Sequence, residues 1–343
     1  MKRTLLSTAL AALLVATSCA GSGSDSKPAK KEAPERKGWS GGSLYGDVES
    51  VTITRYKLSD KFGEVVKDTD GYKEVYKFNP KGDVTEEAYY NSDGSLDRKY
   101  LYKYDSQGNQ IERARYNSDG SLDRKYLYKY DSQGNLIEEA YYNSDGSLRW
   151  KECYKYDSQG NQIERARYNS DGSLDYKYLY KYDTQGNMIE VAFYNGDGSL
   201  DWKSLYKYDS QGNMIALAGY EGDGSLSSKS LYKHDTQGNL IEIASYYVDG
   251  SLSSKSLYKY DSQGNMIALA GYEGDGSLSY KYLNEYDSQG NMIEVAGYNS
   301  EGSLSSKYLF KYDSQGNWIE KVEYEGEIMK PTRMVELTIV YRK

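Results

Sequence analysis

Carboxylates are the most abundant groups in this chain that could carry out acid–base chemistry. Glutamates recur every 26 residues, at Glu112, Glu138, Glu164 and Glu190. Aspartates recur in the same way, at Asp105, Asp131 and Asp157. Two carboxylates can cooperate in hydrolysis, but a catalytic site needs one distinctive pocket that tunes a pKa. Because each carboxylate repeats in nearly the same context, we predict turn caps and cross-strand ion pairs with lysines such as Lys99, Lys125 and Lys151.

Histidine and cysteine are too scarce to build a metal site or a catalytic triad. The chain holds one histidine, His234, and two cysteines, Cys19 and Cys153. A zinc site needs three or four such ligands, and no residue is marked as a nucleophile for His234 to activate. Residues 117–123 have part of the spacing of a calcium loop, but Arg115 stands where that pattern needs an acid. We therefore expect no metal, no cofactor and no catalytic residue.

Aromatic residues are the strongest functional lead. The chain has 40 tyrosines and four tryptophans, against four phenylalanines. One slot of the repeat holds the four candidate binding residues: Trp150, Trp202, Tyr176 and Tyr280. A row of rings could stack on sugars or anchor a protein partner. The alternative is that the rings only pack against one another across strands, and the sequence leaves both interpretations open.

A 26-residue repeat must position these side chains. The motif Tyr-Asp-Ser-Gln-Gly-Asn, or a close variant, begins at residues 104, 130, 156, 182, 208, 234, 260, 286 and 312, and a degenerate copy begins at 78. Each unit has a second turn, such as residues 91–94 and 117–120. Both turns usually begin with Asp or Asn and have Gly at the fourth position, which predicts type I turns with a left-handed Gly and a bulged hairpin.

The segments between the turns have the length and alternation of β-strands. In residues 122–130, Leu122, Tyr126, Tyr128 and Tyr130 share one face, and polar residues occupy most of the other. A Gly every 12 to 14 residues leaves no room for a stable helix. We predict an all-β, elongated, antiparallel hairpin array with two strands per repeat. About 20 strands would extend over roughly 90 Å, in a twisted or spiralled sheet whose curvature the sequence does not give.

One face of the array changes character along the chain. The slot of Arg113 and Arg165 is aliphatic in the five copies from Val191 to Val295. The slot of Arg115 and Arg167 is Gly or Ser in the four copies from Gly219 to Gly297. A face that changes while the turns stay constant could carry specificity, and drift or a change of sheet curvature would leave the same pattern.

The N-terminus has the pattern of an export signal. Lys2 and Arg3 precede an apolar run over residues 5–15 that is too short to span a bilayer. Residues 16–18 are small and stand directly before Cys19, which resembles a bacterial lipoprotein signal, although Ala16 replaces the usual Leu. The resemblance implies a signal peptide over 1–18 and lipidation of Cys19. An ordinary secretory signal with a nearby Cys is the alternative.

Charge and composition narrow the partners. Residues 19–43 are rich in Gly, Ser and Lys and read as a flexible linker. The net charge is −8, with both signs mixed along the chain, and this disfavours nucleic acid, which binds basic surfaces. The expected partners are a membrane, through the lipid, and a carbohydrate or protein ligand. The oligomeric state cannot be read from the sequence.

The iterated motif also resembles a known family. Tyr-Asp-x-x-Gly-Asn followed by Ile-Glu, repeated with Tyr-Asn-x-Asp-Gly-Ser-Leu, is similar to the YD repeats of the Rhs family over about residues 76–326. That resemblance implies a spiralling β-sheet, often a hollow shell. For short YD-repeat proteins it implies a location at the cell surface and carbohydrate binding.

Together these features predict a non-catalytic, surface-exposed lipoprotein of the bacterial envelope, at the outer membrane. Strands over 44–77 would cap a repeat array over 78–326, and a strand over 327–343 would cap its other end. The array would act as a binding or adhesion module for a glycan or protein. The alternative is an envelope spacer, or a fragment of an Rhs-like shell, with no specific ligand.

Overall fold

The computed structural model describes residues 36–39, 42–61, 64–326 and 328–343, and these form β-strands joined by short turns. The strands are β1 (Arg36–Trp39), β2 (Gly42–Tyr45), β3 (Val48–Lys61), β4 (Glu64–Phe78), β5 (Val84–Tyr90), β6 (Leu96–Tyr104), β7 (Gln110–Asn117), β8 (Leu122–Tyr130), β9 (Leu136–Asn143), β10 (Leu148–Tyr156), β11 (Gln162–Asn169), β12 (Leu174–Tyr182), β13 (Met188–Asn195), β14 (Leu200–Tyr208), β15 (Met214–Glu221), β16 (Leu226–His234), β17 (Leu240–Tyr246), β18 (Leu252–Tyr260), β19 (Met266–Glu273), β20 (Leu278–Tyr286), β21 (Met292–Tyr298), β22 (Leu304–Tyr312), β23 (Trp318–Glu325) and β24 (Lys330–Tyr341). In these ranges no helix is long and apolar enough to cross a membrane.

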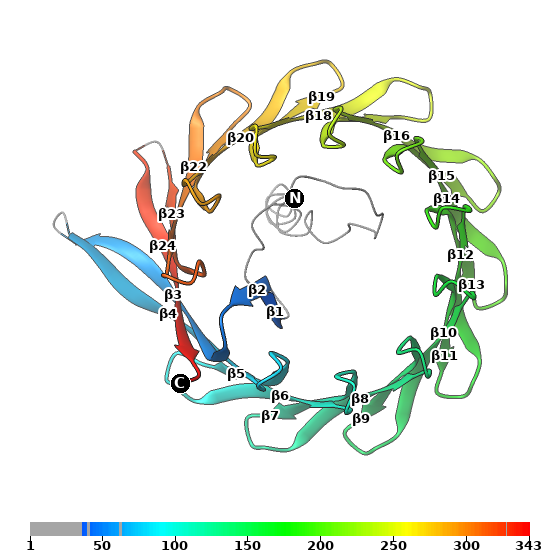
Figure 1. Ribbon diagram of the computed structural model, residues 1–343, viewed down its shortest axis with the longest axis horizontal. Helices are drawn as coiled ribbons and strands as arrows, with labels where there is room; N and C mark the ends of the chain where they lie inside the picture. Colours follow the sequence, from blue (N-terminus) through cyan, green and yellow to red (C-terminus); the bar gives the residue numbers. More distant parts are fainter. Residues whose placement is uncertain (1–35, 40–41, 62–63, 327) are drawn as a thin grey trace.

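The strands form a closed ring. Each strand from β3 to β24 pairs antiparallel with the next, and β24 pairs with β3, so 22 strands close on themselves (Figure 1). The predicted all-β hairpin array, with two strands per repeat, is confirmed. Its curvature, which the sequence left open, bends the expected long axis into a ring. The terminal segments expected to cap separate ends pair with each other instead.

The turns have the predicted geometry. In the first full repeat, the amide of Gly108 donates to the carbonyl of Asp105 at 3.2 Å, and Gly108 has φ +94°. The Asp105 carboxylate accepts hydrogen bonds from the amides of Gln107 and Asn109 at 2.9 and 2.8 Å. The amide of Asp105 donates to the carbonyl of Asn109 at 2.9 Å with Gly108 as the extra residue, which is a G1 bulge, and a further register shift lies between Lys103 and Tyr104. The aspartates of this motif are therefore turn caps, as predicted.

A ladder of tyrosine hydroxyls ties each hairpin to the one before it. The last tyrosine of a strand donates to the carbonyl 20 residues earlier at 2.7 to 2.9 Å, in Tyr104, Tyr130, Tyr156, Tyr182, Tyr208, Tyr260, Tyr286 and Tyr312. His234 occupies this position in β16, and its buried Nδ1 has no hydrogen-bond partner. The ladder is thus interrupted once, at the only histidine.

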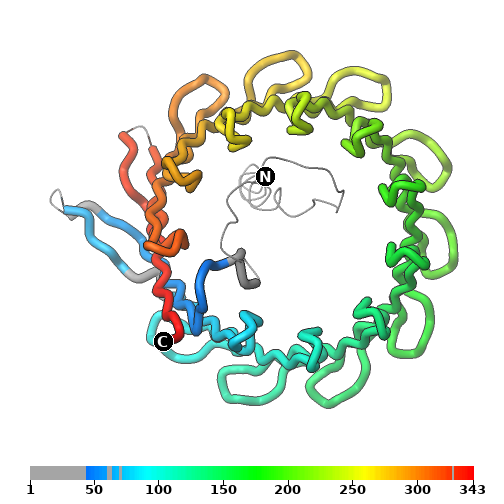
Figure 2. Tube along the Cα trace, in the orientation of Figure 1, coloured from blue at the N-terminus to red at the C-terminus, as the bar shows by residue number. Residues whose placement is uncertain are grey.

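One face of the sheet lines the ring interior. The short sheet β1–β2 lies inside the ring (Figure 1), and Figure 2 shows the Cα trace of the closed wall around it. Leu44 of β2 is buried in a cluster with Val51, Tyr76 and Phe78 of the wall. Because Leu44 reaches the wall from inside, the face that carries Tyr76 and Phe78 is the inner face. Residues paired in register share a face, so the pairing extends this assignment round the wall to Trp202.

The outer face carries the recurring ion pairs. Lys103 contacts Glu112 at 2.9 Å across one hairpin, and Lys129 contacts Glu138 at 2.7 Å across the next. Cross-strand pairing of the repeated glutamates is confirmed. The predicted partner is wrong for these two copies but right for two later ones, where Lys255 and Lys307, the equivalents of Lys125, contact Glu242 and Glu294 at 3.1 and 2.8 Å. In the first two copies the lysine lies directly opposite the glutamate in register, whereas Lys125 of the next hairpin does not. Lys103 and Lys129 are about two-thirds exposed, so the outer face meets water.

The ring is too wide for its own side chains to fill. Twenty-two strands at about 4.8 Å spacing give a circumference of about 106 Å and a backbone diameter of about 34 Å for upright strands, and more if they tilt. Side chains reaching about 6 Å inward from each side would leave open space along the axis. The inner face is therefore a concave surface around a space that the side chains of the wall do not fill.

Candidate functional site

The register brings three of the four predicted binding residues together. Trp150 lies on β10, Tyr176 on β12 and Trp202 on β14, all on the inner face. Tyr280 lies on β20, six strands beyond Trp202 in the ring. The four residues share a slot of the repeat but do not form one continuous row, because the copies between Trp202 and Tyr280 have Ser in that slot.

Trp150 is covered on both faces of its ring. On one side it stacks on Tyr141 of β9, with ring centroids 5.6 Å apart and an angle of 9°. On the other side the guanidinium of Arg167, on β11, lies 4.3 Å from the ring centroid. The ring of Trp150 therefore packs across the strands against a neighbour on each side.

Trp202 stacks on an aromatic residue in the equivalent position on one side, but no arginine lies at the equivalent position on the other side. It stacks on Phe193 of β13 at 5.9 Å and 14°, and Tyr178 meets its edge at 6.1 Å. On β15 the position equivalent to Arg167 is Gly219, which pairs with Ser204. A Cβ at Gly219 would meet Ser228 and Ser227, and no indole atom is among its nearest neighbours. Trp202 therefore lacks, on the side toward β15, the guanidinium that covers Trp150, and it pairs there in register with Glu221.

Tyr176 and Tyr280 are fixed in the wall. The hydroxyl of Tyr176 donates to Glu152 at 2.6 Å, and its ring lies 5.7 Å from Phe193. Tyr280 pairs with Gly271, and a Cβ at Gly271 would come within 2.4 Å of the Tyr280 ring. The ring of Tyr280 therefore packs directly against the backbone of Gly271. Of the two tryptophans, Trp202 is the one with a glycine at the neighbouring position that holds Arg167 beside Trp150.

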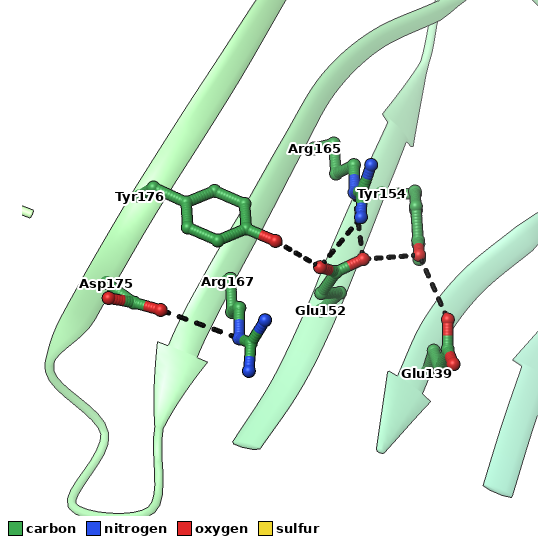
Figure 3. A network of polar contacts seen from close by, with 7 residues as sticks. All are labelled: Glu139, Glu152, Tyr154, Arg165, Arg167, Asp175 and Tyr176. Atoms are coloured by element: carbon green, nitrogen blue, oxygen red, sulfur yellow. Dashed lines mark hydrogen bonds and ion pairs between the residues drawn. The ribbon is translucent and has the colours of Figure 1, made fainter. Parts of the chain in front are cut away.

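A buried carboxylate lies beside this aromatic group. Glu152 of β10 is 2% exposed and accepts two hydrogen bonds from Arg165, at 2.8 and 2.9 Å. The hydroxyls of Tyr154 and Tyr176 also donate to it, at 2.8 and 2.6 Å (Figure 3). Tyr154 lies 3.4 Å from a second carboxylate, Glu139 of β9. The sequence analysis missed this network.

The two carboxylates have opposite pKa shifts. Burial alone would raise the pKa of Glu152, but hydrogen bonds from Arg165 and the two tyrosines outweigh burial and lower that pKa below its ordinary value. Burial, followed by the charge of Glu152, raises the pKa of Glu139. Glu139 and Glu152 lie directly opposite each other in register. Glu152 is therefore the ionised hub, and Glu139 takes up a proton more readily.

A signal for this network is present in the sequence. Both glutamates depart from their repeat slots, because Glu139 stands where Arg113 and Arg165 stand in neighbouring copies. Glu152 replaces the tyrosine found in the same slot at Tyr126 and Tyr178. Their 13-residue separation hides the contact, which arises only because two neighbouring strands run antiparallel.

Beyond Trp202 two rows of side chains on the inner wall lose their charged residues. The slot changes noted in the sequence place Leu217, Ile243 and Leu269 in one row, and Gly219 and Ser245 in the next. The hydroxyls of Ser230 and Ser245 lie 3.0 Å apart across the strands. Over β15–β19 the drift therefore replaces charged side chains by aliphatic ones in the first row and by Gly or Ser in the second, and Tyr206, Tyr232 and Tyr258 pair with the aliphatic residues on the same face.

Comparisons with known proteins give only distant likeness to solved structures. No protein family model and no curated protein matches this chain. Among solved structures, TcdB2-TccC3 without its hypervariable C-terminal region is 13% identical, with 77% of this chain and 18% of that chain covered and a TM-score of 0.31. A porin-like protein from Bacteroides uniformis is 10% identical, with 85% and 98% covered and a TM-score of 0.31. The chain thus spans under a fifth of the first of these proteins.

The fold and the site together define a class, a closed ring of β-hairpin repeats with an aromatic inner wall. The resemblance to YD repeats and the lipoprotein signal stay predictions. Cys19, the expected lipid attachment site, lies outside the described residues.

Proposed function

We propose that this protein is a non-catalytic binding module of the bacterial envelope whose inner wall holds a carbohydrate chain. The ligand would stack on the face of Trp202 that has no arginine neighbour and would lie along the row of Gly and Ser residues on β15–β19. The lipid on Cys19 would anchor the ring at the outer membrane, facing the outside of the cell.

The observation that carries this proposal is the contrast between two equivalent tryptophans. Trp150 is enclosed by Tyr141 and Arg167, whereas Trp202 has Gly219 in place of that arginine. A sugar ring stacks on an aromatic face and needs hydrogen-bonding groups around it. The serine hydroxyls of the nearby strand β16, such as those of Ser228 and Ser230, supply such groups.

The size of the ring favours a chain ligand over a folded protein. A domain of 100 residues has a radius of gyration of about 13 Å and is therefore about 34 Å across, which matches the backbone diameter of an upright ring before side chains are subtracted. An extended polymer about 10 Å wide would enter freely. This favours a glycan on the inner wall over a docked protein domain.

The test is a binding screen with a matched pair of tryptophan variants. Neutral, amino and acidic oligosaccharides, and a set of peptides for comparison, would be titrated against the chain carrying Cys19→Ala, and binding would be followed by intrinsic fluorescence and calorimetry. We expect saturable binding that falls at least tenfold in Trp202→Ala and much less in Trp150→Ala. Equal losses in both variants, or binding of peptides alone, would refute the proposal. Silence across the whole screen would favour the envelope spacer.

The membrane anchor has its own test. Incorporation of labelled palmitate into the full chain in a bacterial host, with fractionation of inner and outer membranes, would locate the protein. We expect label in the outer-membrane fraction and its loss in Cys19→Ala. Export without label would favour the ordinary secretory signal.

A further inference from the structure

The ring closes at a seam that differs from the repeats. There β3, β24 and β23 pair side by side, and their inner side contains a cavity of about 200 Å³. It is lined by Arg55 and Tyr56 of β3, by Lys321 and Glu323 of β23, and by Arg333, Met334 and Val335 of β24. We call this the seam pocket.

Positive charge exceeds negative charge in the seam pocket. Three cations line it against one carboxylate, Glu323. Arg55 is paired with Glu74, which lies outside the lining. Glu323 already accepts a hydrogen bond from the Tyr308 hydroxyl at 3.0 Å. Within the described part of the chain, neither Lys321 nor Arg333 has a carboxylate within 4.0 Å, so two cations share the pocket without an ion pair.

Lys321 is the least expected of these cations. Its slot holds Val295, Leu269 and other aliphatic residues in the preceding copies. Its ammonium group lies 4.6 Å from the ring centroid of Tyr308, and burial lowers its pKa. A partly buried ammonium without a carboxylate partner is costly, and a bound anion would remove that cost.

We propose that the seam pocket binds a small organic anion. Its oxyanion head, a carboxylate or phosphate, would lie between Lys321, Arg333 and Arg55, because a guanidinium can donate two parallel hydrogen bonds to such a group. Its apolar body would pack on Val335, which pairs in register with both Lys321 and Arg55 and so shares their face. This site lies on a different part of the wall from Trp202 and does not depend on the proposed carbohydrate function.

The test uses two simple anions and a matched lysine pair. Inorganic phosphate and benzoate would be titrated against the full chain at constant ionic strength, with sodium chloride as the reference, and followed by thermal shift and calorimetry. Lys321→Met keeps the apolar stem and removes the charge. Lys311→Met removes an exposed lysine from the outer face of the neighbouring strand, where Lys311 pairs with Glu320.

We expect saturable stabilisation of the wild-type chain and of Lys311→Met by at least one anion, and at least tenfold weaker binding to Lys321→Met. Phosphate as the stronger ligand would define a phosphate-type site, and benzoate would define a carboxylate with an apolar body. An equal response in both variants, or no saturable response in the wild type, would overturn the proposal. Circular dichroism verifies that Lys321→Met is folded, and Trp202→Ala should retain anion binding.

Discussion

Removing Arg165 should destabilise the ring more than removing its partner Glu152. The two partners differ sharply in solvent access, since the side chain of Glu152, taken without its backbone, is 3% exposed and that of Arg165 is 38% exposed. In Arg165→Ala a carboxylate stays buried where water cannot replace the guanidinium. In Glu152→Ala the guanidinium that remains can be hydrated. The same ion pair therefore gives unequal losses, depending on which partner is deleted.

The magnitudes follow from that asymmetry. Leaving one partner of a buried pair uncompensated costs about 3–5 kcal/mol. We expect about 3 kcal/mol for Arg165→Ala, because Tyr154 and Tyr176 still donate to the carboxylate. Glu152→Ala loses hydrogen bonds and some packing but buries no lone charge, so about 1–2 kcal/mol is expected.

Urea unfolding followed by circular dichroism would measure both losses, with similar m values required for the comparison. The folded-state pKa of Glu152 is lowered, so its contribution is present above its ordinary pKa and is lost as the pH falls through the folded value. The difference in the free energy of unfolding between wild type and Arg165→Ala should therefore become smaller at acid pH. A larger loss in Glu152→Ala, or a difference that persists unchanged at acid pH, would refute the reasoning.

Three further outcomes are expected in the same unfolding assay. His234→Tyr should add the missing hydroxyl bond of the ladder and stabilise the ring by about 1 kcal/mol, and Tyr130→Phe should cost about as much; no gain would mean that another group already serves this position. Gly120→Ala should cost about 1 kcal/mol through backbone strain alone, because Gly120 has φ +83° and nothing lies within 4 Å of its added Cβ. Glu139→Gln should stabilise the protein at pH 7 by about 0.5 kcal/mol by removing a like charge across the strands. The pKa of Glu139 is raised, so wild type regains stability as the pH falls through that raised pKa, and the advantage should vanish in acid; an advantage that grows in acid would contradict this.

Local features of the fold could be predicted because they depend on neighbours in the sequence. An Asx residue three positions before Gly determines a type I turn, and the structure has Gly108 in the left-handed region with Asp105 as its cap. Alternation between the turns determines which tyrosines share a face. These properties need only a few consecutive residues, and they recur in every unit.

Features that depend on register could not be predicted in the same way. The ion-pair partner of Glu112 is Lys103 rather than Lys125, because bulges shift the register by one residue near each turn. The opposition of Glu139 and Glu152 depends on the same register. The absence of a guanidinium beside Trp202 depends on a glycine on the next strand. In each case the relevant contact is between strands.

Closure is decided where the sequence leaves the repeat. The repeat strands carry tyrosine and lysine, whereas the seam brings together Val51, Ile53 and Leu337, which are 0 to 5% exposed and belong to the described core cluster. An open array would leave two unpaired edges that invite aggregation, and the pairing of β3 with β24 removes both. Antiparallel closure requires an even number of strands, and each 26-residue unit supplies two. The number of units can therefore set the width of the ring, while the terminal strands alone set whether it closes.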